Sequence, residues 1–80
     1  MVTAEDIRRY IGERLPCERV DVEGDGHHFE AVIVSERFRG LSRLEQHQLV
    51  YGALGGRMRQ EIHALSMRTL TPEEWQATHG

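Results

Sequence analysis

The sequence predicts one small α+β domain, with the element order αββααβα and a three-stranded mixed sheet. Three observations predict this fold. Two segments of alternating polar and apolar residues flank the turn residues Gly24-Asp25-Gly26, which is typical of a β-hairpin. Apolar residues recur at helical spacing over residues 44–62, and a third alternating segment follows at residues 64–70. We expect the domain to occupy residues 1–80.

The first helix is predicted to begin after Thr3 and to end before Pro16. Thr3 can act as N-cap, and the acidic residues that follow it suit the positive end of the helix dipole. Proline cannot continue a helix because it lacks the backbone N–H. The apolar residues of this helix form one stripe, which consists of Ile7, Tyr10, Ile11 and Leu15.

The hairpin is predicted to join a strand from Arg19 to Glu23 with a second strand from His28 to Ser35. The second strand contains three consecutive β-branched residues, at positions 32–34. Such a run is typical of a strand that is buried on both faces. We therefore expect the second strand to be central in the sheet and covered on both faces or nearly so.

A short helical turn at residues 36–38 should lead to one long helix, which Ser42 caps together with Glu45. Three glycines lie inside this helix, at positions 52, 55 and 56, and each costs roughly 0.5–1 kcal/mol relative to alanine. We therefore expect a kink, a frayed C-terminal half or close packing against the sheet. The predicted core-facing stripe is Leu44, His47, Tyr51, Leu54, Met58 and Ile62.

A third strand should follow the long helix, because Leu65, Met67 and Thr69 alternate with smaller or polar residues. Two strands joined by a helical crossover normally run parallel, so we expect this strand to be parallel to the second. The hairpin keeps the first two strands antiparallel. Thr71 and Pro72 begin the last helix, in which Trp75 is expected to close one edge of the core.

Composition excludes several classes of function. The formal net charge is −3, although residues 36–70 carry six arginines against three acidic residues; this balance disfavours nucleic-acid binding without excluding it. No apolar run approaches the roughly 20 residues that a membrane span requires, so we expect a cytoplasmic protein. There is no hydrolytic triad, phosphate-binding loop or dinucleotide motif, and we expect no enzymatic activity. Cys17 is the only cysteine and is interpreted as a partly buried apolar residue.

The five histidines differ in the role that their positions predict. His47 lies on the predicted core stripe and is interpreted as a hydrogen-bonded structural residue, and we expect no function for His79 in the C-terminal tail. His63 lies where the long helix ends and the third strand begins, and its position alone leaves a metal-ligand role open. His27 and His28 are adjacent in the hairpin turn.

The chain resembles the BolA family in five pieces that occur in the same order. These are the histidine-containing hairpin turn at residues 24–29, Phe38-x-Gly40, Gln46-His47 with Val50, Ile62-His63-Ala64, and Leu70-Thr71-Pro72-x-x-Trp75. The resemblance extends from about Asp6 to Trp75, and the turn is similar to that of the members with histidine in the first β-turn. It implies a fold like that of class II KH domains.

The resemblance also implies a function. In BolA-like proteins the histidine at the position of His63 coordinates a [2Fe-2S] cluster shared with a monothiol glutaredoxin, whose cysteine and bound glutathione supply other ligands. A second ligand comes from the hairpin; His28 fits the family position better and His27 is the alternative. Adjacent strand residues point to opposite faces, so only one should reach the cluster. Histidine in place of thiolate raises the reduction potential and makes the cluster labile.

A second function remains open, since bacterial BolA-like proteins are also associated with transcriptional effects. In this alternative the chain is a nucleic-acid-binding regulator that uses a KH-like fold. Arg37, Arg39 and Arg43 would contact phosphates, although the same arginines also fit a solvated surface. The sequence does not decide whether the chain forms a homodimer.

Overall fold

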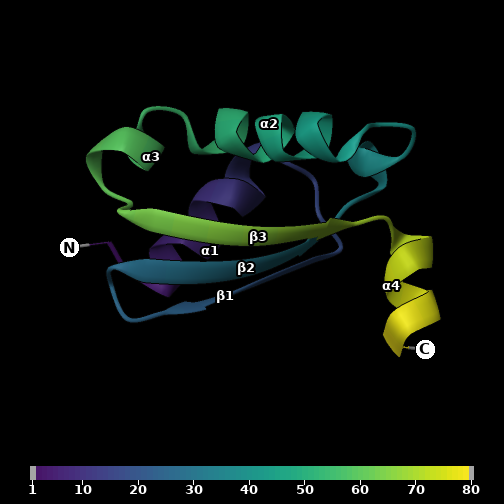
Figure 1. Cartoon of the computed structure of the whole chain (residues 1–80), viewed down its shortest axis with the longest axis horizontal. Coiled ribbons are helices and arrows are strands. Elements are labelled where there is room, and N and C mark those ends of the chain that lie inside the picture. Colours follow the sequence, from purple (N-terminus) through teal and green to yellow (C-terminus); the bar gives the residue numbers. More distant parts are fainter. Residues whose placement is uncertain (1, 80) are drawn as a thin grey trace.

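The computed structural model describes residues 2–79 as one three-stranded sheet with helices on one face and at one end (Figure 1). Met1 and Gly80, the ends of the predicted domain, lie outside the described residues, as do the side chains of Arg59 and His79. The predicted fold class is confirmed. The elements are α1 (Ala4–Arg14), β1 (Arg19–Gly24), β2 (His28–Val34), the 3-10 turn η1 (Glu36–Phe38), α2 (Arg43–Leu54), α3 (Arg57–Gln60), β3 (Ala64–Leu70) and α4 (Pro72–His79).

The strand directions and the strand order agree with the prediction. The sheet has the order β1-β2-β3, in which β1 and β2 are antiparallel whereas β2 and β3 are parallel. In the parallel pair, His28 is the register partner of Ala64 and Phe29 is that of Leu65. The hairpin turn before β2 therefore lies beside the residues that enter β3.

The central strand is buried on one face only. Phe29, Ala31 and Ile33 are buried on the face covered by α1 and α2, whereas His28 and Glu30 are exposed on the other face. In Figure 1, α1 lies behind the sheet, α2 runs along the β3 side, and α4 lies at one end. The expectation that β2 is covered on both faces or nearly so is therefore wrong. On the open face β2 is buried only at its last residue, Val34, while Val32 is half-buried.

Three helices begin with the capping boxes that the sequence contains. In each box the cap hydroxyl accepts the backbone N–H of the third helical residue, and that residue's carboxylate accepts the N–H of the cap. This arrangement satisfies two backbone donors that a helix start otherwise leaves without partners. The pairs are Thr3 with Asp6 in α1, Ser42 with Glu45 in α2, and Thr71 with Glu74 in α4.

The predicted long helix is two helices, because α2 ends at Leu54 and the positive φ of Gly55, 62°, turns the chain before α3 begins. The predicted stripe is also wrong in part, since Leu44 and Tyr51 are 68% and 39% exposed. Residues 46, 50, 53 and 54 lie on one side of a helix, and the centre of that side is rotated by roughly 120° from residues 44 and 51. The buried residues of α2 are Gln46, Val50, Ala53 and Leu54.

Gln46 is a polar residue inside the core, and it joins three elements. Its Nε2 donates hydrogen bonds to the carbonyl oxygens of Phe38 and Leu41, at 3.2 and 3.1 Å. Its Oε1 accepts a hydrogen bond from the buried Thr69 hydroxyl at 2.6 Å. These bonds fix the start of α2 against β3 and against the segment that follows η1.

At the far end of the sheet, Trp75 of α4 is half-buried, and its ring lies 4.7 Å from the guanidinium carbon of Arg19. No helix in the described part of the chain is long and apolar enough to cross a membrane.

Candidate functional site

His27 and His63 lie together at one corner of the molecule, where the hairpin turn meets the start of β3. Their ring centroids are 6.1 Å apart and the ring planes are almost perpendicular, at 87°. Both residues are exposed. The sheet explains the pairing: the parallel register that joins His28 to Ala64 places the preceding residues, 27 and 63, opposite each other. The N–H of Ala64 donates to the carbonyl oxygen of His27 at 3.1 Å and closes this end of the ladder.

The hairpin side of the corner is held by Asp25. Its Oδ1 accepts hydrogen bonds from the backbone N–H groups of His27 and His28, at 2.9 and 3.0 Å. These bonds, the one from His28 first, lower the pKa of the Asp25 carboxyl below its usual range. The sequence marked this residue only as part of a turn. An Asp in a glycine-rich turn often accepts hydrogen bonds from backbone N–H groups two or three residues later, in an Asx turn. This pattern could have indicated from the sequence that Asp25 orders the turn.

His28 is directed away from the pair. Its Nε2 is 3.4 Å from the hydroxyl of Ser66 on the open face of the sheet. Because Phe29 is fully buried, alternation along β2 sends the preceding side chain to the opposite face. The structure therefore brings His27, and not His28, beside His63. This geometry favours His27 over the predicted His28 as the second ligand, and the identity of the ligand stays a prediction.

The other side of the corner is formed by α3, which ends at Gln60, and by Glu61 and Ile62, which lead from it to His63. The N–H of Ile62 donates to the carbonyl oxygen of Arg57 at 3.2 Å, and the side chain of Ile62 is buried. His63 follows this anchor and is exposed, and it lies before the start of β3, at the junction where the sequence placed it.

The donor set of this corner fits a metal centre that is completed by a second molecule. Two imidazoles are available, and among the side chains that the structure describes no three of His, Cys, Asp or Glu come close enough together to hold a metal ion. Iron–sulfur and zinc sites usually have four protein or cofactor ligands at the metal or cluster. An exposed pair of imidazoles can therefore supply part of such a ligand set and leave the rest to a partner.

Cys17 is not suited to ligand chemistry. It is half-buried, its Sγ lies 3.2 Å from the carbonyl oxygen of Leu15, and burial raises the pKa of its thiol to about 11. Because the thiolate is the form that binds metals, a thiol with this pKa is a poor ligand at neutral pH. The prediction of a partly buried apolar residue is confirmed.

His47 differs from its predicted role. It is half-buried, but its Nε2 is shielded from solvent and has no hydrogen-bond partner among the described residues. The rotation of α2 accounts for this difference, because it places the neighbouring Gln46, and not His47, against the polar groups of the core.

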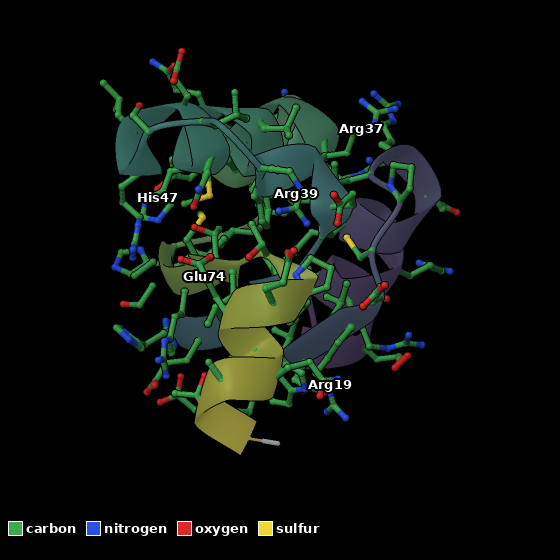
Figure 2. All side chains as sticks on the ribbon, turned by 90° about the vertical axis from the view of Figure 1, so that its right-hand side faces the viewer. Arg19, Arg37, Arg39, His47 and Glu74 are labelled. Atoms are coloured by element: carbon green, nitrogen blue, oxygen red, sulfur yellow. The ribbon has the colours of Figure 1, made fainter. Side chains whose placement is uncertain are left out.

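The three arginines of the nucleic-acid alternative are not equivalent. Arg39 forms ion pairs with Glu36 and Glu73, which raise the pKa of its guanidinium, the hydrogen bond to Glu36 contributing most. Arg37 and Arg43 are exposed and form no ion pair within the described residues. In Figure 2, Arg37 projects from the molecule on the side opposite to His47. Of the three arginines expected to contact phosphates, only Arg37 and Arg43 are therefore without an ion pair among the described residues.

A shallow groove of about 500 Å³ lies on the open face of the sheet. None of the histidines lines it. Three carboxylates and one guanidinium, that of Arg68, do, so that acidic groups predominate; Glu23 and Glu30 are direct register partners across β1 and β2. A surface of this charge repels phosphate groups, so the groove does not support nucleic-acid binding.

Comparisons with known proteins agree with the resemblance seen in the sequence. A family model described as BolA-like protein matches residues 13–74. The Escherichia coli acid stress protein IbaG is 39% identical over 71 residues, which cover 88% of this chain and 84% of that protein. A Haemophilus influenzae protein named DNA-binding transcriptional regulator BolA is 41% identical over 54 residues, 68% of this chain and 52% of that protein. The solved structure of a bolA protein homologue from Coxiella burnetii matches with a TM-score of 0.87 and 51% identity, and covers 95% of this chain and 99% of that one.

Proposed function

The chain belongs to the BolA-like protein family, and from this premise we propose that it is an iron–sulfur cluster accessory protein that pairs with a monothiol glutaredoxin. In the proposed complex a [2Fe-2S] cluster is shared between the two proteins. His63 and His27 are the ligands from this chain, and the cysteine and the bound glutathione of the partner supply the others. The chain acts in the cytoplasm and catalyses no reaction of its own.

The observation that carries this proposal is the pair of exposed imidazoles at the corner between β2 and β3. The pair is too small to hold a metal centre alone, and no third donor of the usual kinds joins it among the described side chains. This arrangement supports a partner that brings thiolates, as does the unsuitability of Cys17.

The residues of this chain have distinct parts in the proposed complex. His27 and His63 bind as neutral imidazoles, so protonation of either ring competes with binding. Asp25 holds the backbone on which His27 is mounted. A cluster with histidine ligands has a higher reduction potential than one with thiolates only and is released more readily, which suits transfer or sensing.

The proposal is tested by the visible absorption and circular dichroism spectra of this protein co-expressed with a monothiol glutaredoxin. His63→Ala and His27→Ala should abolish or alter a spectrum that is specific to the mixed complex. His28→Ala is the matched control, since its ring points to the other face of the sheet, and should leave the spectrum unchanged. A spectrum equal to that of glutaredoxin alone in every preparation would end the iron–sulfur proposal. Sensitivity to His28→Ala in place of His27→Ala would reverse the assignment within the turn.

A second candidate function, nucleic-acid binding, is favoured by the unpaired Arg37 and Arg43 and by the name of the Haemophilus relative. With two phosphate contacts, the logarithm of affinity for duplex DNA should fall against the logarithm of salt concentration with a slope of about −2, and Arg37→Ala should reduce this slope by about 0.9. Arg8→Ala is the control, because Arg8 is paired with Glu5 on α1. An affinity that does not change with salt would exclude this candidate.

A further inference from the structure

The segment that carries His63 has few anchors of its own. The helix α3 has four residues, and Gly55 and Gly56 separate it from α2. Helices this short are not stable alone in water, so tertiary contacts must hold them. On the core side the anchors are the buried Ile62 and the half-buried Met58.

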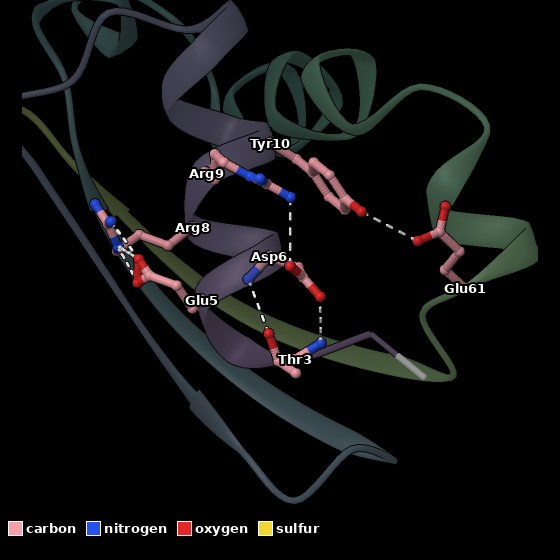
Figure 3. Close-up of polar contacts among 7 residues, drawn as sticks. All are labelled: Thr3, Glu5, Asp6, Arg8, Arg9, Tyr10 and Glu61. Atoms are coloured by element: carbon pink, nitrogen blue, oxygen red, sulfur yellow. Dashed lines mark hydrogen bonds and ion pairs between the residues drawn. The ribbon is translucent and has the colours of Figure 1, made fainter.

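The other anchor is one side chain of α1, Tyr10. Its hydroxyl donates a hydrogen bond to Oε1 of Glu61 at 3.3 Å, and the two residues are 51 positions apart in the chain (Figure 3). The guanidinium carbon of Arg57 lies 4.0 Å from the centroid of the Tyr10 ring, a cation–π contact. Tyr10 therefore holds residues at both ends of α3, the first residue of the helix and the one that follows its last.

The base of this contact is itself well fixed. Tyr10 lies in the middle of α1, whose first turn is closed by the Thr3 and Asp6 capping box. Arg9 adds an ion pair to Asp6 at 3.3 Å and lies 5.5 Å from the Tyr10 ring (Figure 3). The half-buried ring of Tyr10 therefore links α3 to a well-ordered part of α1.

We infer that Tyr10 is a positioning residue for the histidine pair: by holding Arg57 and Glu61 it places His63 opposite His27. Because His63 is two residues beyond Glu61, release of Glu61 lets the entry to β3 move while β3 itself stays paired with β2. The importance of this placement for cluster sharing rests on the proposed function. The placement itself is a property of the chain alone.

The test compares Tyr10→Leu and Tyr10→Phe with the wild-type chain, without partner, by NMR. The readouts are the ring-to-ring contact of His27 and His63 and the amide exchange of residues 57–63. Tyr10→Leu should weaken the ring contact and speed exchange in this segment roughly tenfold, the factor expected for loss of a cation–π contact and a hydrogen bond worth about 1.4 kcal/mol together. Tyr10→Phe keeps the ring over Arg57 and should restore the ring contact and part of the protection.

Tyr51→Leu is the matched control, because Tyr51 is an exposed tyrosine of α2. If Tyr10→Leu leaves the histidine rings and the exchange of residues 57–63 as Tyr51→Leu does, the inference is overturned. The same variants are then combined with a monothiol glutaredoxin, where Tyr10→Leu should shorten the lifetime of the mixed-complex spectrum. A wild-type chain that gives no such spectrum would refute the proposed function, whereas the NMR result on the free chain would still decide the role of Tyr10.

Discussion

Replacing Gln46 by leucine should destabilise the fold more than any surface substitution in α2. Gln46 is 8% exposed, and its loss leaves the carbonyl oxygen of Leu41 and the hydroxyl of Thr69 without their partners. The Phe38 carbonyl still accepts the N–H of Leu41 at 3.1 Å. Each orphaned polar group costs about 1–3 kcal/mol, so we expect a loss of about 2–6 kcal/mol for the two. A domain of this size has roughly 4–12 kcal/mol of stability in total.

The assay is urea unfolding at pH 7, followed by far-UV circular dichroism and by Trp75 fluorescence. Gln48→Leu is the control on the exposed face of the same helix and should change stability by no more than about 0.5 kcal/mol. Adding Thr69→Val to Gln46→Leu should recover part of the loss, because it removes one orphaned hydroxyl. A cost of Gln46→Leu as small as that of Gln48→Leu, or strict additivity with Thr69→Val, would refute the reasoning.

Four further substitutions or reactions have expected outcomes. Gly52→Ala should raise the free energy of unfolding in urea by about 1 kcal/mol, since an added Cβ meets nothing within 4 Å and alanine favours the helix. An unchanged free energy of unfolding would contradict a helical, unobstructed position 52. Gly55→Ala should destabilise by about 1–3 kcal/mol, because φ is 62°, and a neutral result would contradict this backbone conformation. Iodoacetamide should label Cys17 in the folded chain at pH 8 about 100-fold more slowly than in urea, as its thiol pKa rises from 9.0 to about 11; equal rates would show that the thiol is not buried. The Asp25 carboxyl should titrate by NMR below its ordinary 3.8, so that turn order is complete above this value and is lost as pH falls through the lowered pKa; a midpoint at or above 3.8 would argue against the Asx turn.

Much of the fold could be predicted from local patterns. The three capping boxes, the strand that begins at residue 19, the strand that begins at residue 28 and the break at Gly55 all depend on residues within about four positions of one another. The strand directions followed from general rules for hairpins and crossovers, without knowledge of any contact. His63 was placed correctly at a junction for the same reason, since the change from helical to alternating periodicity is visible in the chain itself.

The predictions that were wrong concern which face of α2 is buried and how many faces of β2 are covered. Leu44 and Tyr51 are apolar and at helical spacing, yet they are exposed because the rotation of α2 is set by Gln46 and Val50 packing against distant elements. The run of β-branched residues in β2 suggested two covered faces, but the placement of α1 and α2 leaves most of one face open.

The sequence by itself determined the elements, their order and the presence of histidines at two turns. Only the tertiary structure decided that His27 is the partner of His63, that Gln46 is a core residue and that Tyr10 reaches α3. The physical reason is the range of the interactions. Caps and periodicity act between neighbours along the chain, whereas these three contacts depend on the register of β2 with β3 and on the rotation of helices, which are fixed only when the whole core packs.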